Sequence, residues 1–119
     1  MTETYKFQKL TVYQLALDHT DAVYEIAGKL PRSESFNLRS QVIRAATSIV
    51  LNIAEGSTSQ SDAEQNRFLG HSVRSYLETV ACWDLIERRN YLNAIELKDV
   101  RNQGHELFIK LIAFRKSLK

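Results

Sequence analysis

Residues that break or cross-link a chain are scarce in this sequence. Its 119 residues include one proline, one cysteine and four glycines. With so few breakers, the long periodic runs between them predict helices and not many short strands. The cysteine, Cys82, has no partner for an internal disulfide, and its neighbours Ala81 and Trp83 indicate a small buried residue. No histidine lies near it in sequence, which argues against a nucleophilic role.

Long apolar runs and the common catalytic motifs are also missing. No run of 18 apolar residues occurs and the first ten residues are polar, so we expect a cytoplasmic protein without a membrane span. The glycine-rich nucleotide-binding motifs and the hydrolase motif G-x-S-x-G are absent. His19, His71 and His105 fall in three separate predicted helices, and none has a second His or Cys three or four residues away. We therefore expect no enzyme, no metal site and no cofactor.

The overall charge is too small to indicate a partner by itself. Sixteen basic and 14 acidic residues give a net charge of +2. Residues 107–119 differ, because they hold four basic residues and no acid: Lys110, Arg115, Lys116 and Lys119. Two interpretations remain open, a solvated helix end whose cations complement the helix dipole and a surface that binds phosphate groups.

The strongest helical pattern runs from Gln41 to Gly56. Its apolar residues cover about half of the helix circumference. They are Leu38, Val42, Ala45, Ala46, Ile49 and Ile53 on one side, extended by Ile43, Val50 and Ala54. This pattern predicts a helix that packs on two sides, and Gly56 is expected to end it in a left-handed conformation.

Four helices are predicted, at about 7–29, 37–55, 62–89 and 96–118. Gly28 and Leu30-Pro31 end the first, and Ser33 or Ser35 is expected to cap the second. The third begins with the capping box Ser61-x-x-Glu64. Short loops favour antiparallel neighbours, so residues 1–119 are predicted to form a single all-α domain, an up-down-up-down four-helix bundle.

Small and hydroxyl-bearing residues line one face of the third predicted helix. They are centred on Ser72, Ser75 and Thr79, and they favour a close approach to the second helix. We expect a polar network between these two helices in which Arg44 pairs with Glu78. Its members are Gln41, Arg44, Ser48, Asn52, Glu55, Ser75 and Glu78. In the fourth helix, Gly104 marks a tight crossing.

Several short motifs resemble one known family, that of the four-helix bundle proteins encoded in intervening sequences of bacterial 23S ribosomal RNA genes. They are Pro31-x-x-Glu34, Leu38-x-x-Gln41, Arg44-Ala45-Ala46-x-Ser48-Ile49, Asn52-Ile53-Ala54-Glu55-Gly56, Phe68-Leu69 and Ser75-x-x-Glu78. The resemblance implies a four-helix bundle that assembles into a ring-like homopentamer. Related accessory proteins of diversity-generating retroelements bind nucleic acid and a reverse transcriptase through a basic surface.

The leading hypothesis is therefore a non-enzymatic homo-oligomer that binds nucleic acid, RNA in particular. The residues expected to contact phosphates are Arg88, Arg89, Lys110, Arg115, Lys116 and Lys119. We expect other protomers to cover the second apolar side of helix two, as well as Ile109 and Ile112, while Phe108 and Phe114 belong to the core.

Two alternatives remain open. One is a protein-interaction scaffold that contacts another protein, such as a reverse transcriptase, through Leu51 and Leu77, with no direct role for nucleic acid. The other is an enzyme whose site lies between protomers and uses Arg44, Glu55 or Glu78.

Overall fold

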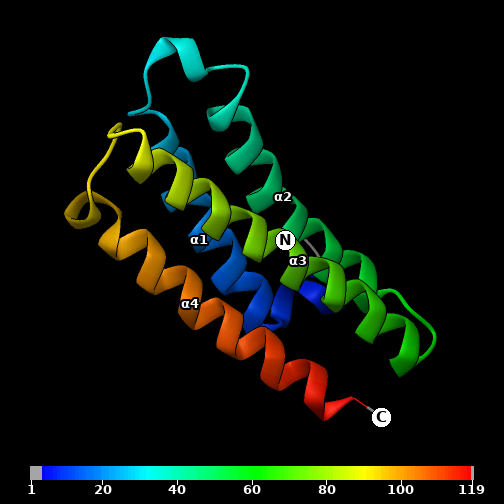
Figure 1. Cartoon of the computed structure of the whole chain (residues 1–119). Coiled ribbons are helices and arrows are strands. Elements are labelled where there is room, and N and C mark those ends of the chain that lie inside the picture. The colour runs from blue at the N-terminus through cyan, green and yellow to red at the C-terminus, as the bar shows by residue number, and fades with distance from the viewer. Residues whose placement is uncertain (1–3, 119) are drawn as a thin grey trace.

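Four antiparallel helices form the protein in the computed structural model, which describes residues 4–118 (Figure 1). They are α1 (Thr11–Ala27), α2 (Leu38–Ser57), α3 (Asp62–Arg88) and α4 (Ala94–Ser117), with short 3-10 turns at Lys6–Lys9 and Arg32–Glu34. Each helix packs most closely against two others, in the cyclic order α1, α2, α3, α4, and the His19 ring of α1 also reaches the Tyr76 ring of α3 across the bundle. The predicted all-α up-down-up-down bundle is confirmed.

The helix boundaries follow the predicted ones closely, and local capping explains where α3 and α4 begin. Oγ of Ser61 accepts a hydrogen bond from the backbone N–H of Glu64 at 3.1 Å, as expected for the N-cap of α3. At α4, Oδ1 of Asn93 accepts from the N–H of Glu96 at 2.8 Å, and the Glu96 carboxylate accepts from the N–H of Asn93 at 3.0 Å. This second capping box was not predicted, and it starts α4 two residues earlier than expected.

The expected serine cap of α2 is wrong. Asn37 occupies the N-cap position, and neither Ser33 nor Ser35 caps the helix. Instead, Oε1 of Glu34 accepts from the backbone N–H of Leu38 at 3.3 Å, while its Oε2 accepts from the Tyr91 hydroxyl at 2.8 Å. The Tyr91 hydrogen bond is the main reason that the pKa of Glu34 lies below its usual value.

Two glycines mark close helix crossings. The expected left-handed conformation of Gly56 is wrong, because its φ is not positive and α2 continues to Ser57. A Cβ at Gly56 would lie 3.0 Å from Cβ of Phe68, so the glycine lets α2 and α3 approach each other. A Cβ at Gly104 would lie 2.9 Å from ring atoms of both His19 and Tyr76, which confirms the tight crossing predicted there.

The core consists of two apolar clusters, one toward each end of the bundle. Trp83 belongs to the first and Leu69 to the second. Within the chain, α2 packs against α1 as well as α3, which buries Val50 to 8% exposure, whereas Ile43 and Ala54 are half-buried. That another protomer covers the rest of this side stays a prediction. Ile112 also packs against the second cluster, whereas Ile109 remains 52% exposed.

Candidate nucleic-acid interface

Arg115 is held in a fixed position at the end of the bundle where α3 begins and α4 ends. Its Nε donates a hydrogen bond to Oδ1 of Asn66 on α3 at 2.7 Å. Its guanidinium group lies over Gly70, where an added Cβ would be 3.3 Å from Nη2. The amide is neutral, so Arg115 is oriented without losing its positive charge.

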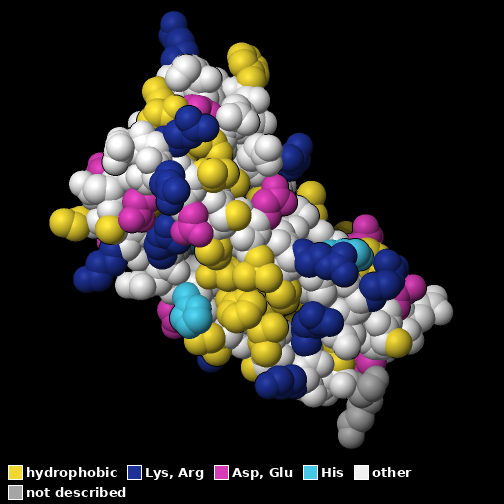
Figure 2. All heavy atoms as spheres, viewed as in Figure 1, with side chains coloured by type: hydrophobic (Ala, Val, Ile, Leu, Met, Phe, Trp, Pro, Cys, Tyr) yellow, Lys and Arg dark blue, Asp and Glu magenta, His cyan; other side chains and the backbone are white. Residues whose placement is uncertain are grey.

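Further cations share this end of the bundle. The guanidinium of Arg67 lies over the ring of Phe68, 4.6 Å from the ring centroid, and Lys116 is exposed beside Arg115. Arg74 is exposed two turns after Arg67, on the same face of α3 but near the middle of the helix. We refer to Arg67, Arg115 and Lys116 as the cationic end. On the face shown in Figure 2, Lys and Arg side chains border an apolar patch toward this end.

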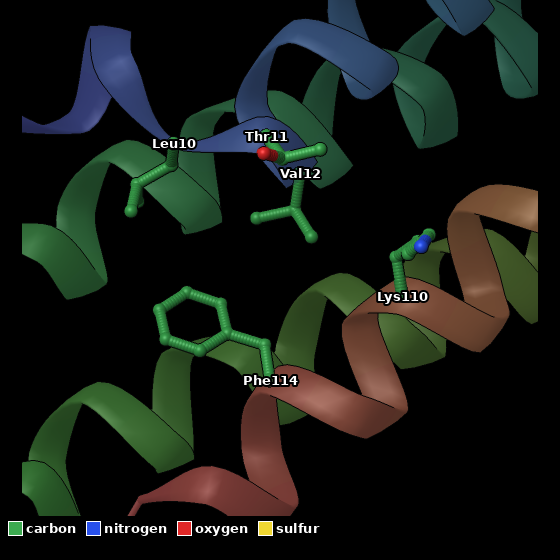
Figure 3. Close-up of a pocket in the computed structure, with 5 residues that line it drawn as sticks. All are labelled: Leu10, Thr11, Val12, Lys110 and Phe114. Atoms are coloured by element: carbon green, nitrogen blue, oxygen red, sulfur yellow. The ribbon is translucent and has the colours of Figure 1, made fainter.

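The cations that the sequence singled out do not form one surface. Arg88 and Arg89 are exposed at the opposite end of α3, about 33 Å along the helix from the residues that contact Arg115. Lys110 turns toward α1, where it lines a pocket of about 280 Å³ with Leu10, Thr11, Val12 and Phe114 (Figure 3). Lys119 lies outside the described residues. Only Arg115 and Lys116 of the predicted set therefore belong to the cationic end.

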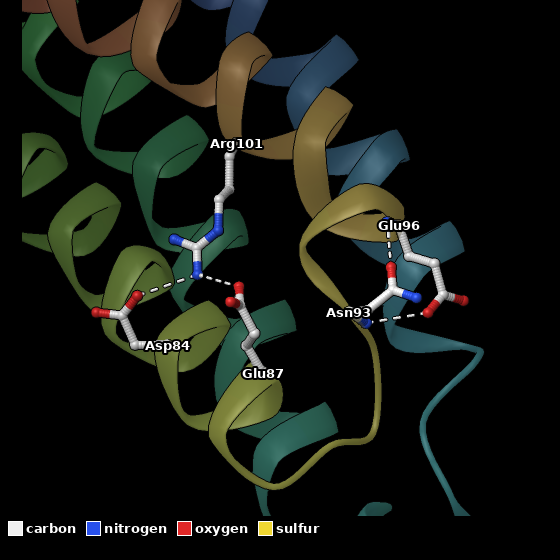
Figure 4. Close-up of polar contacts among 5 residues, drawn as sticks. All are labelled: Asp84, Glu87, Asn93, Glu96 and Arg101. Atoms are coloured by element: carbon white, nitrogen blue, oxygen red, sulfur yellow. Dashed lines mark hydrogen bonds and ion pairs between the residues drawn. The ribbon is translucent and has the colours of Figure 1, made fainter.

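Arg101 makes both of the ion pairs found within residues 4–118. Its Nη2 lies 3.0 Å from Oδ1 of Asp84 and 3.4 Å from Oε1 of Glu87 on α3. Figure 4 shows these ion pairs together with the capping box of Asn93 and Glu96 that starts α4. The cations of the cationic end take part in no ion pair with a described carboxylate. Their charge remains available for an external anion.

Hydroxyl groups link α2 to α3, as the small residues of α3 predicted. Oγ of Ser75 donates to Oγ of Ser48 at 2.9 Å, and Oγ of Ser72 donates to the carbonyl oxygen of Ile49 at 2.9 Å. Asn52 donates to the carbonyl oxygen of Ser48 at 2.9 Å, within α2. The bonds of Ser72 and Ser75 fix the position of α2 relative to α3.

The remaining polar residues of α2 do not extend this network. Nη2 of Arg44 lies 3.4 Å from Oε1 of Gln41 on the same helix, and no ion pair joins it to Glu78 within the described chain. The predicted pairing of Arg44 with Glu78 is therefore wrong. Arg44 and Glu55 instead line an open groove of about 420 Å³, together with Thr47, Ser48, Leu51 and Asn52.

The only cysteine is not an activated nucleophile. Cys82 is buried in the first apolar cluster, and burial is the main cause that raises the pKa of its thiol. The negative charge of Glu78 raises this pKa further. Among residues 4–118, no group of three or more His, Cys, Asp or Glu side chains is arranged to hold a metal ion.

The family model described as 23S rRNA-intervening sequence protein matches residues 8–113. The chain belongs to this family. The predicted resemblance is thereby confirmed, and the match spans all four helices. A search of curated proteins gives no match.

Comparison with solved structures supports the same fold for this member of the 23S rRNA-intervening sequence protein family. One similar structure is a protein of unknown function from the S23 ribosomal protein family of Bacteroides thetaiotaomicron. It is 24% identical, with a TM-score of 0.82, over 89% of this chain and 99% of the other. No helix within residues 4–118 combines the length and the apolar character that crossing a membrane requires.

Arg67 and Arg74 are the candidate residues that sequence reasoning missed. The first turn of their helix contains the acidic residues Asp62 and Glu64, so the net charge of this segment does not indicate a phosphate-binding surface. Their spacing of seven residues places both on one side of α3, and this pattern was available in the sequence. What the sequence did not contain is the contact of Arg115 on α4 with Asn66, the residue before Arg67.

Proposed function

We propose that this chain is a non-enzymatic, homo-oligomeric protein of the cytoplasm that binds nucleic acid, RNA in particular, through phosphate contacts from the cationic end. The observation that carries the proposal is the fixed guanidinium of Arg115. It is oriented by Asn66 and Gly70, and Arg67 and Lys116, at the same end of the bundle, form no ion pair with a described carboxylate. An arginine held in this way loses little side-chain entropy when it binds a phosphate.

Self-association would multiply this weak positive charge. Each chain carries a net charge of only +2, and the affinity for a polyanion grows with the number of phosphates contacted at the same time. The pentamer implied by the family resemblance would present five cationic ends. An exposed leucine on α2 offers contact surface for such an assembly, since Leu51 is 61% exposed.

Salt dependence combined with charge reversal tests the proposal. The binding of labelled RNA to nuclease-treated protein is measured by fluorescence anisotropy at about 50 mM and about 200 mM salt. We expect the double variant Arg115→Glu, Lys116→Glu to weaken binding by at least about 100-fold, because attraction at two phosphate contacts becomes repulsion. Light scattering on the same samples gives the oligomeric state.

The matched control reverses the same number of charges at the other end of the bundle. The variant Arg88→Glu, Arg89→Glu should bind with an affinity close to that of the unmodified chain. Affinity that does not change with salt, or that survives reversal at Arg115 and Lys116, would contradict the proposal.

The groove beside Leu51 favours a second candidate function, a scaffold that binds another protein, for example a reverse transcriptase. Leu51 is exposed in the open groove lined by Arg44, Asn52 and Glu55, where an apolar side chain surrounded by polar ones suits a partner surface. In this case a stoichiometric partner should co-purify after nuclease treatment and be lost in Leu51→Ser. A chain that keeps its partner in Leu51→Ser would exclude this groove as the contact.

A further inference from the structure

Three aromatic rings from α3 and α4 are stacked in a row that reaches from the core to the surface. The rings of Tyr76 and Phe108 are stacked with centroids 5.3 Å apart and an interplanar angle of 26°. The imidazole of His105 also stacks near Phe108, with the two ring centroids 6.2 Å apart and an interplanar angle of 24°. Tyr76 is buried, Phe108 is half-buried and His105 is exposed. We call these three residues the aromatic ladder.

The aromatic ladder lies between α3 and α4, on the same side of the bundle as Arg115. Phe108, Ile112 and Arg115 follow one another at helical spacing, and the first and last of them contact α3. His105 and Arg115 are about 15 Å apart along the helix axis. The side chains of Leu77 and Ile109 are about half exposed, and apolar side chains form a continuous patch between the two helices in Figure 2.

Aromatic rings beside cations suit a strand whose bases are unpaired. Every base has a π-face that can stack on a Phe, Tyr or His ring, and proteins that bind single strands combine such rings with a positively charged track for the backbone. In a duplex the bases are already stacked and paired inside the helix, so only its phosphates can reach this surface. A spacing of about 15 Å is within the reach of a few nucleotides of single strand.

We infer that the aromatic ladder is a stacking platform for an unpaired base of a bound single strand, while Arg115 and Lys116 hold the adjacent phosphates. The inference rests on the proposed function and refines it, because it assigns a ligand class, single-stranded nucleic acid or an unpaired loop. It also changes the role expected for Phe108 from a core residue to one that contacts both the core and the ligand.

The test compares a single strand with a duplex of equal length, about 12 nucleotides. Both carry one 2-aminopurine, whose fluorescence falls when the base stacks on a ring. We expect the unmodified chain to bind the single strand about tenfold more tightly and to change the 2-aminopurine signal only in that strand. Phe108→Leu should remove most of this preference, because leucine keeps the apolar contact but has no ring. Its affinity for the duplex should not change.

Two further variants keep the test decisive. His105→Ala alters only an exposed side chain, so it tests the ladder even if Phe108→Leu fails to fold, and it should weaken single-strand binding severalfold. Tyr24→Leu is the matched control, since Tyr24 is a 54% exposed aromatic residue on α1, outside the ladder, and its loss should change nothing.

The possible outcomes distinguish a failure of the stacking inference from a failure of the proposed function. If neither nucleic acid binds, the proposed function is wrong and the inference falls with it. If both bind equally and only the reversal at Arg115 and Lys116 weakens them, the proposed function stands and the ladder is not a stacking platform. If Phe108→Leu or His105→Ala changes the oligomeric mass, the patch is a contact between copies of the chain, and the inference is overturned.

Discussion

Arg101 and Arg115, toward opposite ends of the bundle, are held in opposite ways. Where α3 ends and α4 begins, Arg101 is engaged by the carboxylates of Asp84 and Glu87. Where α3 begins and α4 ends, Arg115 is held by the amide of Asn66 and by the space that Gly70 leaves. The carboxylates neutralise the charge of Arg101, whereas the neutral amide leaves the charge of Arg115 uncompensated. What a cation contacts therefore says more about its availability to a ligand than how many cations the segment contains.

The largest stability difference is expected between alanine at Gly104 and alanine at Gly70. In Gly104→Ala the new Cβ would meet buried ring atoms of His19 and Tyr76 at 2.9 Å, so we expect the free energy of unfolding to fall by about 1–2 kcal/mol despite the better helix propensity. In Gly70→Ala the Cβ would meet only the guanidinium of Arg115, at 3.3 Å, and this side chain can move away. We expect unchanged or slightly higher stability there, but weaker nucleic-acid binding.

Urea unfolding at one fixed protein concentration measures the first effect and anisotropy the second. A loss of stability in both variants would mean that the position of Arg115 contributes to folding. A Gly70→Ala variant with unchanged nucleic-acid affinity would mean that its orientation does not matter for binding.

Neutralising Asp84 and Glu87, where α3 ends and α4 begins, should leave Arg101 without an ion pair, as Arg115 is at the other end. The double variant Asp84→Asn, Glu87→Gln frees Arg101, beside Arg88 and Arg89, without changing side-chain size. We expect nucleic-acid affinity at about 50 mM salt to rise about tenfold, with a steeper dependence on salt. Stability should fall by less than about 1 kcal/mol, because the Asp84 side chain is 70% exposed. If the dependence of affinity on salt does not change, Arg101 does not contact the nucleic acid even when its ion pairs are removed.

Acid should weaken the contact between α1, α3 and α4 in the middle of the bundle. Burial lowers the pKa of His19 below its usual 6.5, and Nε2 has no hydrogen-bond partner within residues 4–118. Nδ1 lies 3.4 Å from Oε1 of Gln103, and the Tyr76 ring packs near the imidazole, with the two ring centroids 6.4 Å apart. The unfolded chain binds a proton at this imidazole more readily than the folded one. Stability from this group is therefore complete above pH 6.5 and is lost as pH falls below that value.

The variant His19→Leu tests this assignment, because it removes the titration and keeps an apolar side chain of moderate size. We expect the unfolding free energy of the variant to vary less between about pH 5 and about pH 7 than that of the unmodified chain. If both proteins lose the same stability in acid, another group is responsible.

Sequence patterns were sufficient for the elements and insufficient for contacts between side chains. Apolar periodicity located all four helices, and the hydroxyl residues of α3 identified α2 as its close neighbour, as the bond between Ser75 and Ser48 shows. The prediction for Gly56 was wrong because a glycine near a helix end can either adopt a left-handed conformation or allow two helices to cross closely. Only the position of Phe68 decides between them.

The candidate site was predicted in part for the same reason. The acid-free C-terminal segment led to Arg115 and Lys116, but the charges at Arg88 and Arg89 were grouped with them although the antiparallel fold places them at the other end. Arg67 was missed, because its place at the same end of the bundle as Arg115 becomes evident only when Asn66 and Gly70 of α3 pack against α4.

Arg44→Ala should have the smallest effect on stability. The sequence suggested a loss of several kcal/mol through an unpaired Glu78, but Arg44 is exposed and its closest polar contact is a long bond of 3.4 Å to Gln41. Removing such a side chain changes the free energy of unfolding by less than about 0.5 kcal/mol. Urea unfolding of the whole protein at one fixed protein concentration, with no separation of oligomers, measures this directly. A loss above about 2 kcal/mol would mean that Arg44 has a partner from another copy of the chain.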